Sequence, residues 1–122
     1  MRKIKKLKII TNENIINIEV KIYKSFLERF KGLMLKDKIN YPLIFIIPEN
    51  YLLKTGIHTL FMKIPIDILF IDKENRIYDT CSLKPWHFYT PKKEAKYIIE
   101  LEYGFINKNK VEIDNKIIIS DL

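Results

Sequence analysis

The sequence has little cysteine and no long apolar run, and each shortage excludes a class of protein. A single cysteine, Cys81, permits no internal disulfide, which is typical of proteins in a reducing compartment. The longest uncharged stretch, residues 39–48, is about half the ~20 residues that a membrane helix needs, and it contains two prolines. Lysines interrupt the apolar residues near the N-terminus, where a signal peptide requires an unbroken apolar core. We therefore expect a cytoplasmic protein with no membrane partner.

What the sequence does contain is enough apolar material for one compact core. Its 122 residues are 48% hydrophobic and 30% charged, a composition typical of a globular domain. The net charge is +7, and five cations lie within the first eight residues, with no acid among them. The sequence thus predicts a basic N-terminal arm over residues 1–8 and a single globular domain over residues 9–122. Such an arm could bind RNA weakly and in a salt-dependent manner.

Short alternating segments predict the fold. Residues 16–22 alternate apolar and polar side chains, and a turn at residues 12–14 joins them to residues 8–11 in an expected hairpin. A capping-box pattern, Ser25 with Glu28, predicts a short helix before Gly32. Further strands are expected at residues 42–47, 58–62, 68–72, 76–82, 97–102 and 111–119. The fold class is therefore mainly β, a small antiparallel barrel or sandwich with one or two short helices.

Residues 56–72 place His58, Pro65 and Asp67 in a fixed order between two expected strands. Pro65 should interrupt the strand and leave Asp67 near the rim of the sheet. An aromatic loop, residues 83–89, contains Trp86 and could cover the barrel end or offer a stacking platform.

Four segments together resemble the family known as domain of unknown function 192, which comprises small proteins of bacteria and archaea. They are residues 29–34, 57–72, 83–86 and 95–104, in the family's order. The resemblance begins at about Lys24 and implies a compact, mostly β domain without an assigned activity.

Each candidate side chain has a structural reading and a functional one. Arg29 and Asp67 could pair to join the helix to the sheet, or Arg29 could bind an anion and Asp67 could act as a general base. His58 could be a core residue, a metal ligand or one half of a dyad with Cys81. His58 and His87 lack zinc-ligand spacing, so we expect no metal site and no cofactor.

The sequence favours a non-catalytic module that binds a small polar ligand, such as a carbohydrate, or a protein partner. Its predicted ligand-binding residues are Arg29, His58, Asp67 and Trp86. The enzymatic alternative is a small hydrolase or lyase that uses Asp67 and His58. It ranks lower because no nucleophile motif, glycine-rich oxyanion loop or metal set accompanies these two residues. An RNA-associated role for the basic arm is the third reading.

Overall fold

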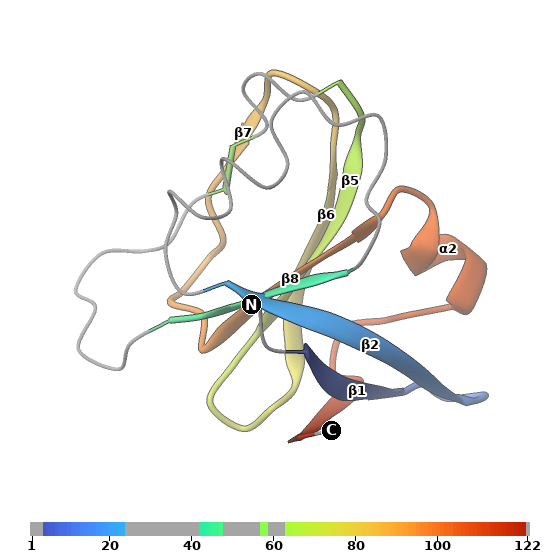
Figure 1. The fold of residues 1–122 in the computed structure, drawn as a ribbon. Coiled ribbons are helices and arrows are strands. Elements are labelled where there is room, and N and C mark those ends of the chain that lie inside the picture. The colour runs from blue at the N-terminus through green and yellow to red at the C-terminus, as the bar shows by residue number, and fades with distance from the viewer. Residues whose placement is uncertain (1–3, 24–41, 48–56, 59–62, 122) are drawn as a thin grey trace.

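A computed structural model of the protein describes residues 4–23, 42–47, 57–58 and 63–121, and it is dominated by one curved sheet (Figure 1). The sheet has seven strands in the order β6-β5-β8-β3-β2-β1-β9. Its strands are β1 (Ile4–Ile10), β2 (Ile15–Tyr23), β3 (Leu43–Ile46), β5 (Ile66–Ile71), β6 (Ile77–Leu83), β8 (Tyr97–Glu102) and β9 (Lys116–Asp121). Two short strands, β4 (Ile57–His58) and β7 (Phe88–Tyr89), form a second sheet. Helix α2 (Phe105–Asn109) follows β8 directly.

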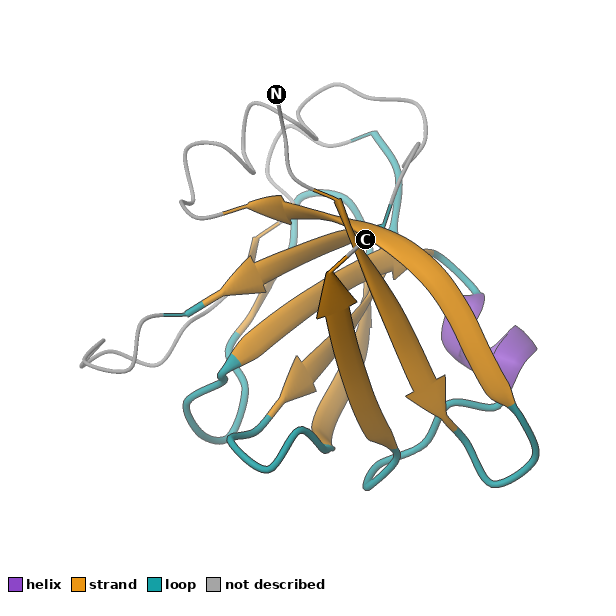
Figure 2. Ribbon diagram, turned by 60° about the horizontal axis from the view of Figure 1, so that its bottom comes forward, coloured by secondary structure: helices purple, strands orange, loops and turns teal. Residues whose placement is uncertain are grey.

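The mainly β prediction is confirmed, but the sheet is not a closed barrel. Figure 2 shows its strands fanned around a curved surface. The edge strands β6 and β9 approach each other through a single bridge, Arg76 to Lys116, within the described residues. The sheet is also mixed rather than antiparallel, since β2 and β3 run parallel. Parallel neighbours need a long crossover, and 19 residues separate these two strands in the sequence.

Apolar clusters lie on both faces of the sheet, and β5 contributes to each of them. Ile66, Ile68 and Phe70 belong to one cluster, whereas Leu69 and Ile71 belong to the other. Successive side chains of a strand point to opposite faces, so every residue of β5 is buried. A strand covered on both faces reads as a continuous apolar run, and Asp67 is the one interruption in this run.

The N-terminal hairpin extends further than predicted and changes the interpretation of the basic arm. From Ile4 onward the supposed arm is strand β1, which lies between β2 and β9. Leu7 is buried, while Lys6 and Lys8 are exposed. The lysines therefore project from one face of a sheet strand, because charges alternate with core residues at the period of a strand.

Several other elements differ from the sequence prediction. The predicted helix at residues 25–31 lies outside the described residues. Helix α2 and strand β7 were not predicted, and β9 begins at Lys116 rather than at Val111. Residues 112–115 instead form a turn in which the Asn115 side chain accepts a hydrogen bond from the Glu112 amide, at 2.8 Å. None of the helices in the described part of the chain has the length and apolar character needed to cross a bilayer.

Candidate functional site

The carboxylate of Asp67 lies at the centre of a buried hydrogen-bond network. Asp67 is 1% exposed and shares its face of β5 with Leu69 and Ile71. Its Oδ2 accepts hydrogen bonds from the backbone amides of Gly104, at 3.1 Å, and Ile106, at 3.0 Å. The hydroxyl of Ser82 donates to Oδ1 at 2.7 Å. Buried carboxylates are tolerated when donors surround them in this way.

Helix α2 needs this carboxylate because its own N-cap residue has no side chain. The N-cap is Gly104, with φ at +93°, in the left-handed region that favours glycine. A capping residue normally accepts a hydrogen bond from the amide two or three residues further on. Here the acceptor comes from β5 instead, so Asp67 fixes the start of α2 against the sheet.

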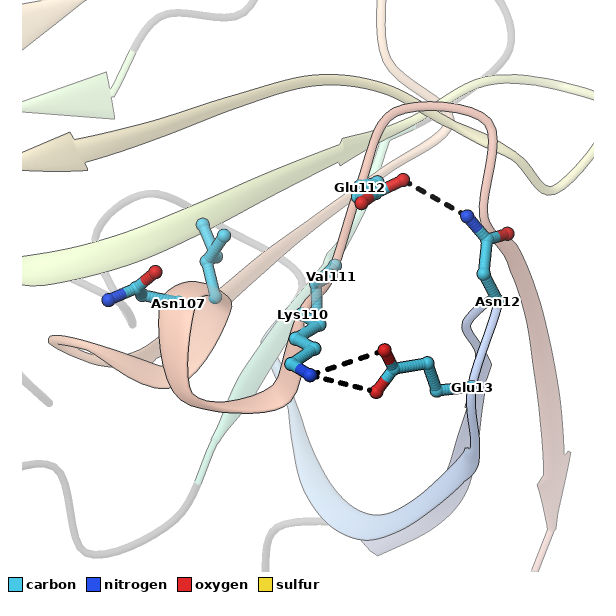
Figure 3. A pocket seen from close by; sticks show the side chains of 7 residues that line it. Asn12, Glu13, Asn107, Lys110, Val111 and Glu112 are labelled. Carbon is cyan, nitrogen blue, oxygen red and sulfur yellow. Dashed lines mark hydrogen bonds and ion pairs between the residues drawn. The ribbon is translucent and has the colours of Figure 1, made fainter.

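A cleft of about 370 Å³ opens between α2 and the turn that joins β1 to β2 (Figure 3). One wall comes from the turn, and the other comes from α2 and the segment after it. Its polar lining residues are Asn12, Glu13, Asn107, Lys110 and Glu112, and its apolar ones are Ile106 and Val111. Side-chain contacts span the cleft in two places. The Asn12 amide donates to Glu112 at 3.1 Å, and Lys110 lies 3.1 Å from Glu13.

Local hydrogen bonds fix both walls of this cleft. In the turn, the hydroxyl of Thr11 donates to the Asn14 carbonyl at 3.0 Å and accepts from the Asn14 amide at 2.9 Å. On the opposite wall, the Asn109 side chain donates to the Phe105 carbonyl at 3.0 Å. Asp67 also contributes, because the amide it binds belongs to Ile106, which lines the cleft. The cleft is therefore organised by residues that do not themselves line it.

A second group of polar side chains lies on the opposite face of the sheet, around Cys81. Cys81 is paired with Ile68, which in turn is paired with Glu100, so all three share one face. Burial, together with the charges of Asp79, Asp67 and Glu100, raises the pKa of Cys81 to about 12. A thiol with this pKa is almost entirely protonated near neutral pH and is a poor nucleophile.

The aromatic loop contains both exposed and anchored residues. Trp86 is 58% exposed and Phe88 is 67% exposed. Tyr89 instead turns toward β6 and donates a hydrogen bond to Asp79 at 2.8 Å. Its ring packs 5.6 Å from that of Phe70, measured between centroids. Burial and the hydrogen bond to Asp79 raise the pKa of Tyr89 to about 12.

The structure does not describe all four predicted ligand-binding residues equally. Arg29 lies outside the described residues. For His58 the structure describes the backbone, which pairs with Phe88. Asp67 is held in a buried network by Ser82 and by the backbone amides of Gly104 and Ile106, and its pairing with Arg29 stays a prediction. Trp86 does not line the cleft beside α2. A ligand site that combines all four residues stays a prediction.

Sequence reasoning missed the residues that line the cleft. Residues 12–14 were recognised as a turn, but nothing in a turn shows what it faces. The one available signal was Gly104 before a short run of helix-compatible residues, a pattern that could have indicated α2. Within the part of the chain that the structure describes, no three of the metal-ligating residue types His, Cys, Asp and Glu gather at one point.

Comparisons with known proteins place the chain in a family. The profile of the DUF192 family, described as "Uncharacterized ACR", matches residues 8–119. A UPF0127 protein of Pyrococcus furiosus is 39% identical over 108 residues, which cover 88% of this chain and 92% of that protein. A UPF0127 protein of Thermococcus sibiricus is 44% identical over 98 residues, which cover 80% of this chain but 64% of the relative. The chain therefore spans less than two thirds of that relative's length.

Solved structures show the same fold at low identity. A crystal structure from Sinorhizobium meliloti 1021, named as a proposed transcription regulator, superposes with a TM-score of 0.86 at 17% identity and covers 99% of this chain and 97% of that one. A protein of unknown function from Novosphingobium aromaticivorans superposes with a TM-score of 0.81 at 15% identity, covering 93% of this chain and 83% of that one. Identities this low show the fold alone. The family profile and the archaeal relatives carry the stronger conclusion, which is that this chain belongs to the DUF192 family.

Proposed function

We propose that the protein is a non-catalytic module that binds a small polar ligand in the cleft between α2 and the β1–β2 turn. The observation that carries this proposal is the composition of the cleft. Two segments about a hundred residues apart in the sequence present amides, carboxylates and an ammonium together with two apolar side chains. Its volume of about 370 Å³ lies within the range that small-molecule sites occupy.

The lining favours a ligand with several hydroxyl or amide groups. Asn12 and Asn107 can each donate and accept hydrogen bonds, whereas Glu13 and Glu112 accept and Lys110 donates. Ile106 and Val111 add a small apolar surface to the lining. A mono- or disaccharide has matching hydroxyls and a weakly apolar ring face, so carbohydrate is the ligand class we favour.

Two of the contacts that now span the cleft would have to be exchanged for contacts with the ligand. Both the Asn12–Glu112 hydrogen bond and the Lys110–Glu13 ion pair are solvent-exposed. Exposed pairs of this kind contribute little stability, about 0–1 kcal/mol each, so their exchange costs little. The walls behind them are held separately by Thr11 and Asp67, which leaves the cleft formed while its surface contacts rearrange.

The enzymatic alternative has weaker support among the described residues. A general base needs a carboxylate lone pair directed at a substrate proton. Both oxygens of Asp67 already accept hydrogen bonds from protein donors, and the side chain is buried. The raised pKa of Cys81 also removes the thiolate that a dyad with His58 would require.

Amide chemical shifts in a two-dimensional NMR spectrum test the proposal. The 15N-labelled full chain would be titrated with glucose, galactose, N-acetylglucosamine and trehalose, each in separate samples. We expect at least one sugar to shift amides at residues 12–13 and 106–112 while leaving β5 and β6 unchanged. The proposal fails if none of these sugars shifts the cleft amides.

The matched variants are Lys110→Asn and Lys108→Asn. Lys110 lines the cleft with φ at +54°, a left-handed conformation that asparagine tolerates well. Lys108 lies on α2, two residues before Lys110, and is exposed, but it does not line the cleft. Lys110→Asn should weaken the binding of a responding sugar, whereas Lys108→Asn should not. Equal binding by both variants would place the sugar elsewhere on the protein.

A further inference from the structure

The outer face of β2, β1 and β9 carries lysines that no described acid neutralises. Strand alternation directs Lys6 and Lys8 to this face, and both are exposed. Cross-strand pairing sets Glu19 and Ser120 on either side of Lys6, and it sets Asn17 and Ile118 on either side of Lys8. Although Glu19 lies directly opposite Lys6, neither ammonium takes part in an ion pair within the described residues. Two cations about 7 Å apart along one strand therefore remain available to an outside anion.

A shallow hollow accompanies these lysines. It encloses about 430 Å³ and is lined by Lys6, Lys8, Asn17, Ile18, Glu19 and Ser120. Asn17 and Ser120 add neutral hydrogen-bond donors beside the two ammonium groups. None of these residues lines the cleft beside α2, so this surface is independent of the proposed ligand site.

The positive charge continues beyond the hollow. Lys116 pairs with Ile10, and Lys21 pairs with Ile4, which places both lysines on the same face. Glu19 is the one carboxylate on this face among the described residues of the three strands. Lys6, Lys8 and Lys116 alone set three cations against one anion along an open surface, and this arrangement complements an extended polyanion rather than a small compact one.

We propose that this face binds the phosphate backbone of single-stranded RNA without sequence preference. A single strand can lie across an open sheet, whereas reading a duplex groove requires a protruding helix or ribbon. Tyr23, the described aromatic residue on this face of the three strands, is buried, so it offers no surface on which a base could stack. Binding is therefore weak, dominated by charge and strongly dependent on salt. The proposal assigns RNA contacts to the face of a sheet strand rather than to a flexible basic arm.

Deleting residues 1–8 cannot test this proposal, because the deletion would remove most of β1 from between β2 and β9. The full chain with point substitutions is required. Binding to a 5′-labelled oligouridine of about 12 nucleotides would be measured by fluorescence anisotropy over a sodium chloride series. The face variant is Lys6→Gln with Lys8→Gln. The matched control is Lys73→Gln with Lys108→Gln, two exposed lysines outside this face with the same total change in charge.

Each phosphate contact contributes about −0.7 to the slope of log K against log salt concentration for a single strand. We therefore expect the face variant to have a slope shallower than wild type by about 1.4, and the control to keep the wild-type slope. Replacing the same two lysines with arginine should preserve the slope, because charge is what the backbone recognises. Thermal melting would show that all the variants remain folded.

Three results would overturn the proposal. The first is the absence of binding by wild type at low salt. The second is an equal change in slope for the face and control variants, which would show a response to net charge alone. The third is a wild-type slope in the face variant, which would place the contacts on other cations.

Discussion

Replacing Asp67 with alanine should destabilise the fold through helix α2. The substitution removes the acceptor for the Gly104 and Ile106 amides and leaves Ser82 without its partner. A hydrogen bond to a charged group contributes about 1.5–3 kcal/mol, and loss of an N-cap acceptor costs about 0.5–2 kcal/mol. Gly104 and Ile106 are half-buried, so water can reach part of the vacated space and offset some of this cost. We expect a loss of about 2–4 kcal/mol in the free energy of unfolding.

Chemical denaturation and thermal melting measure this loss, which corresponds to a fall in Tm of roughly 6–15 °C for a domain of this size. Two companion variants separate its causes. Asp67→Asn keeps an oxygen for the two amides and can donate to the Ser82 hydroxyl, so it should cost only about 1 kcal/mol. Ser82→Ala removes one contact of an exposed hydroxyl and should cost about 1 kcal/mol or less.

Native-state hydrogen exchange locates the effect. In Asp67→Ala, the amides of Gly104 and Ile106 should exchange much faster than in wild type, while the amides of β1 and β2 follow only the change in global stability. A stability change below about 0.5 kcal/mol would refute the reasoning. It would mean that the carboxylate does not hold α2 and is available for a ligand.

The other predictions concern one glycine and two titrating side chains. Gly104→Ala should lower the free energy of unfolding by about 1–2 kcal/mol, measured by thermal or urea unfolding, because a Cβ is strained at a φ of +93°. No steric clash adds to this cost, since no atom lies within 4 Å of the position that the Cβ would take. A neutral effect would mean that the turn relaxes. Cys81 should react with iodoacetamide at pH 8 roughly a thousand times more slowly than an unfolded thiol, because burial raises its pKa from 9 to about 12. Mass spectrometry would follow the alkylation. A reaction at the rate of an unfolded thiol would contradict the burial of Cys81. Because the pKa values of Cys81 and Tyr89 are raised on folding, their contributions to stability are complete below pH 9 and pH 10 respectively and are lost as the pH rises toward 12. Urea midpoints measured from pH 8 to pH 11.5 should therefore fall, and Tyr89→Phe should reduce the fall above pH 10.

Local elements could be predicted from the sequence because their signals are local. The alternation in residues 16–22 predicted β2, and the turn at residues 12–14 predicted its hairpin with β1. A shorter alternation runs through residues 6–9, where the cluster of lysines suggested an arm instead. Period-two patterning was the stronger signal there, since Leu7 and Ile9 are core residues.

The sequence by itself also identified Asp67 as a residue with a structural or chemical role, because it follows Pro65 in the segment of residues 56–72 and could pair with Arg29 or act as a base. Only the tertiary structure decided its partners among the described residues. Pairing of β5 with β8 sets Asp67 opposite Leu101, and the chain then turns at Gly104 to bring two amides to the carboxylate. The cleft beside α2 likewise joins residues near position 12 with residues near position 110. A side-chain pattern specifies which face of a strand is buried, but it does not specify strand order, and strand order determines which distant segments meet.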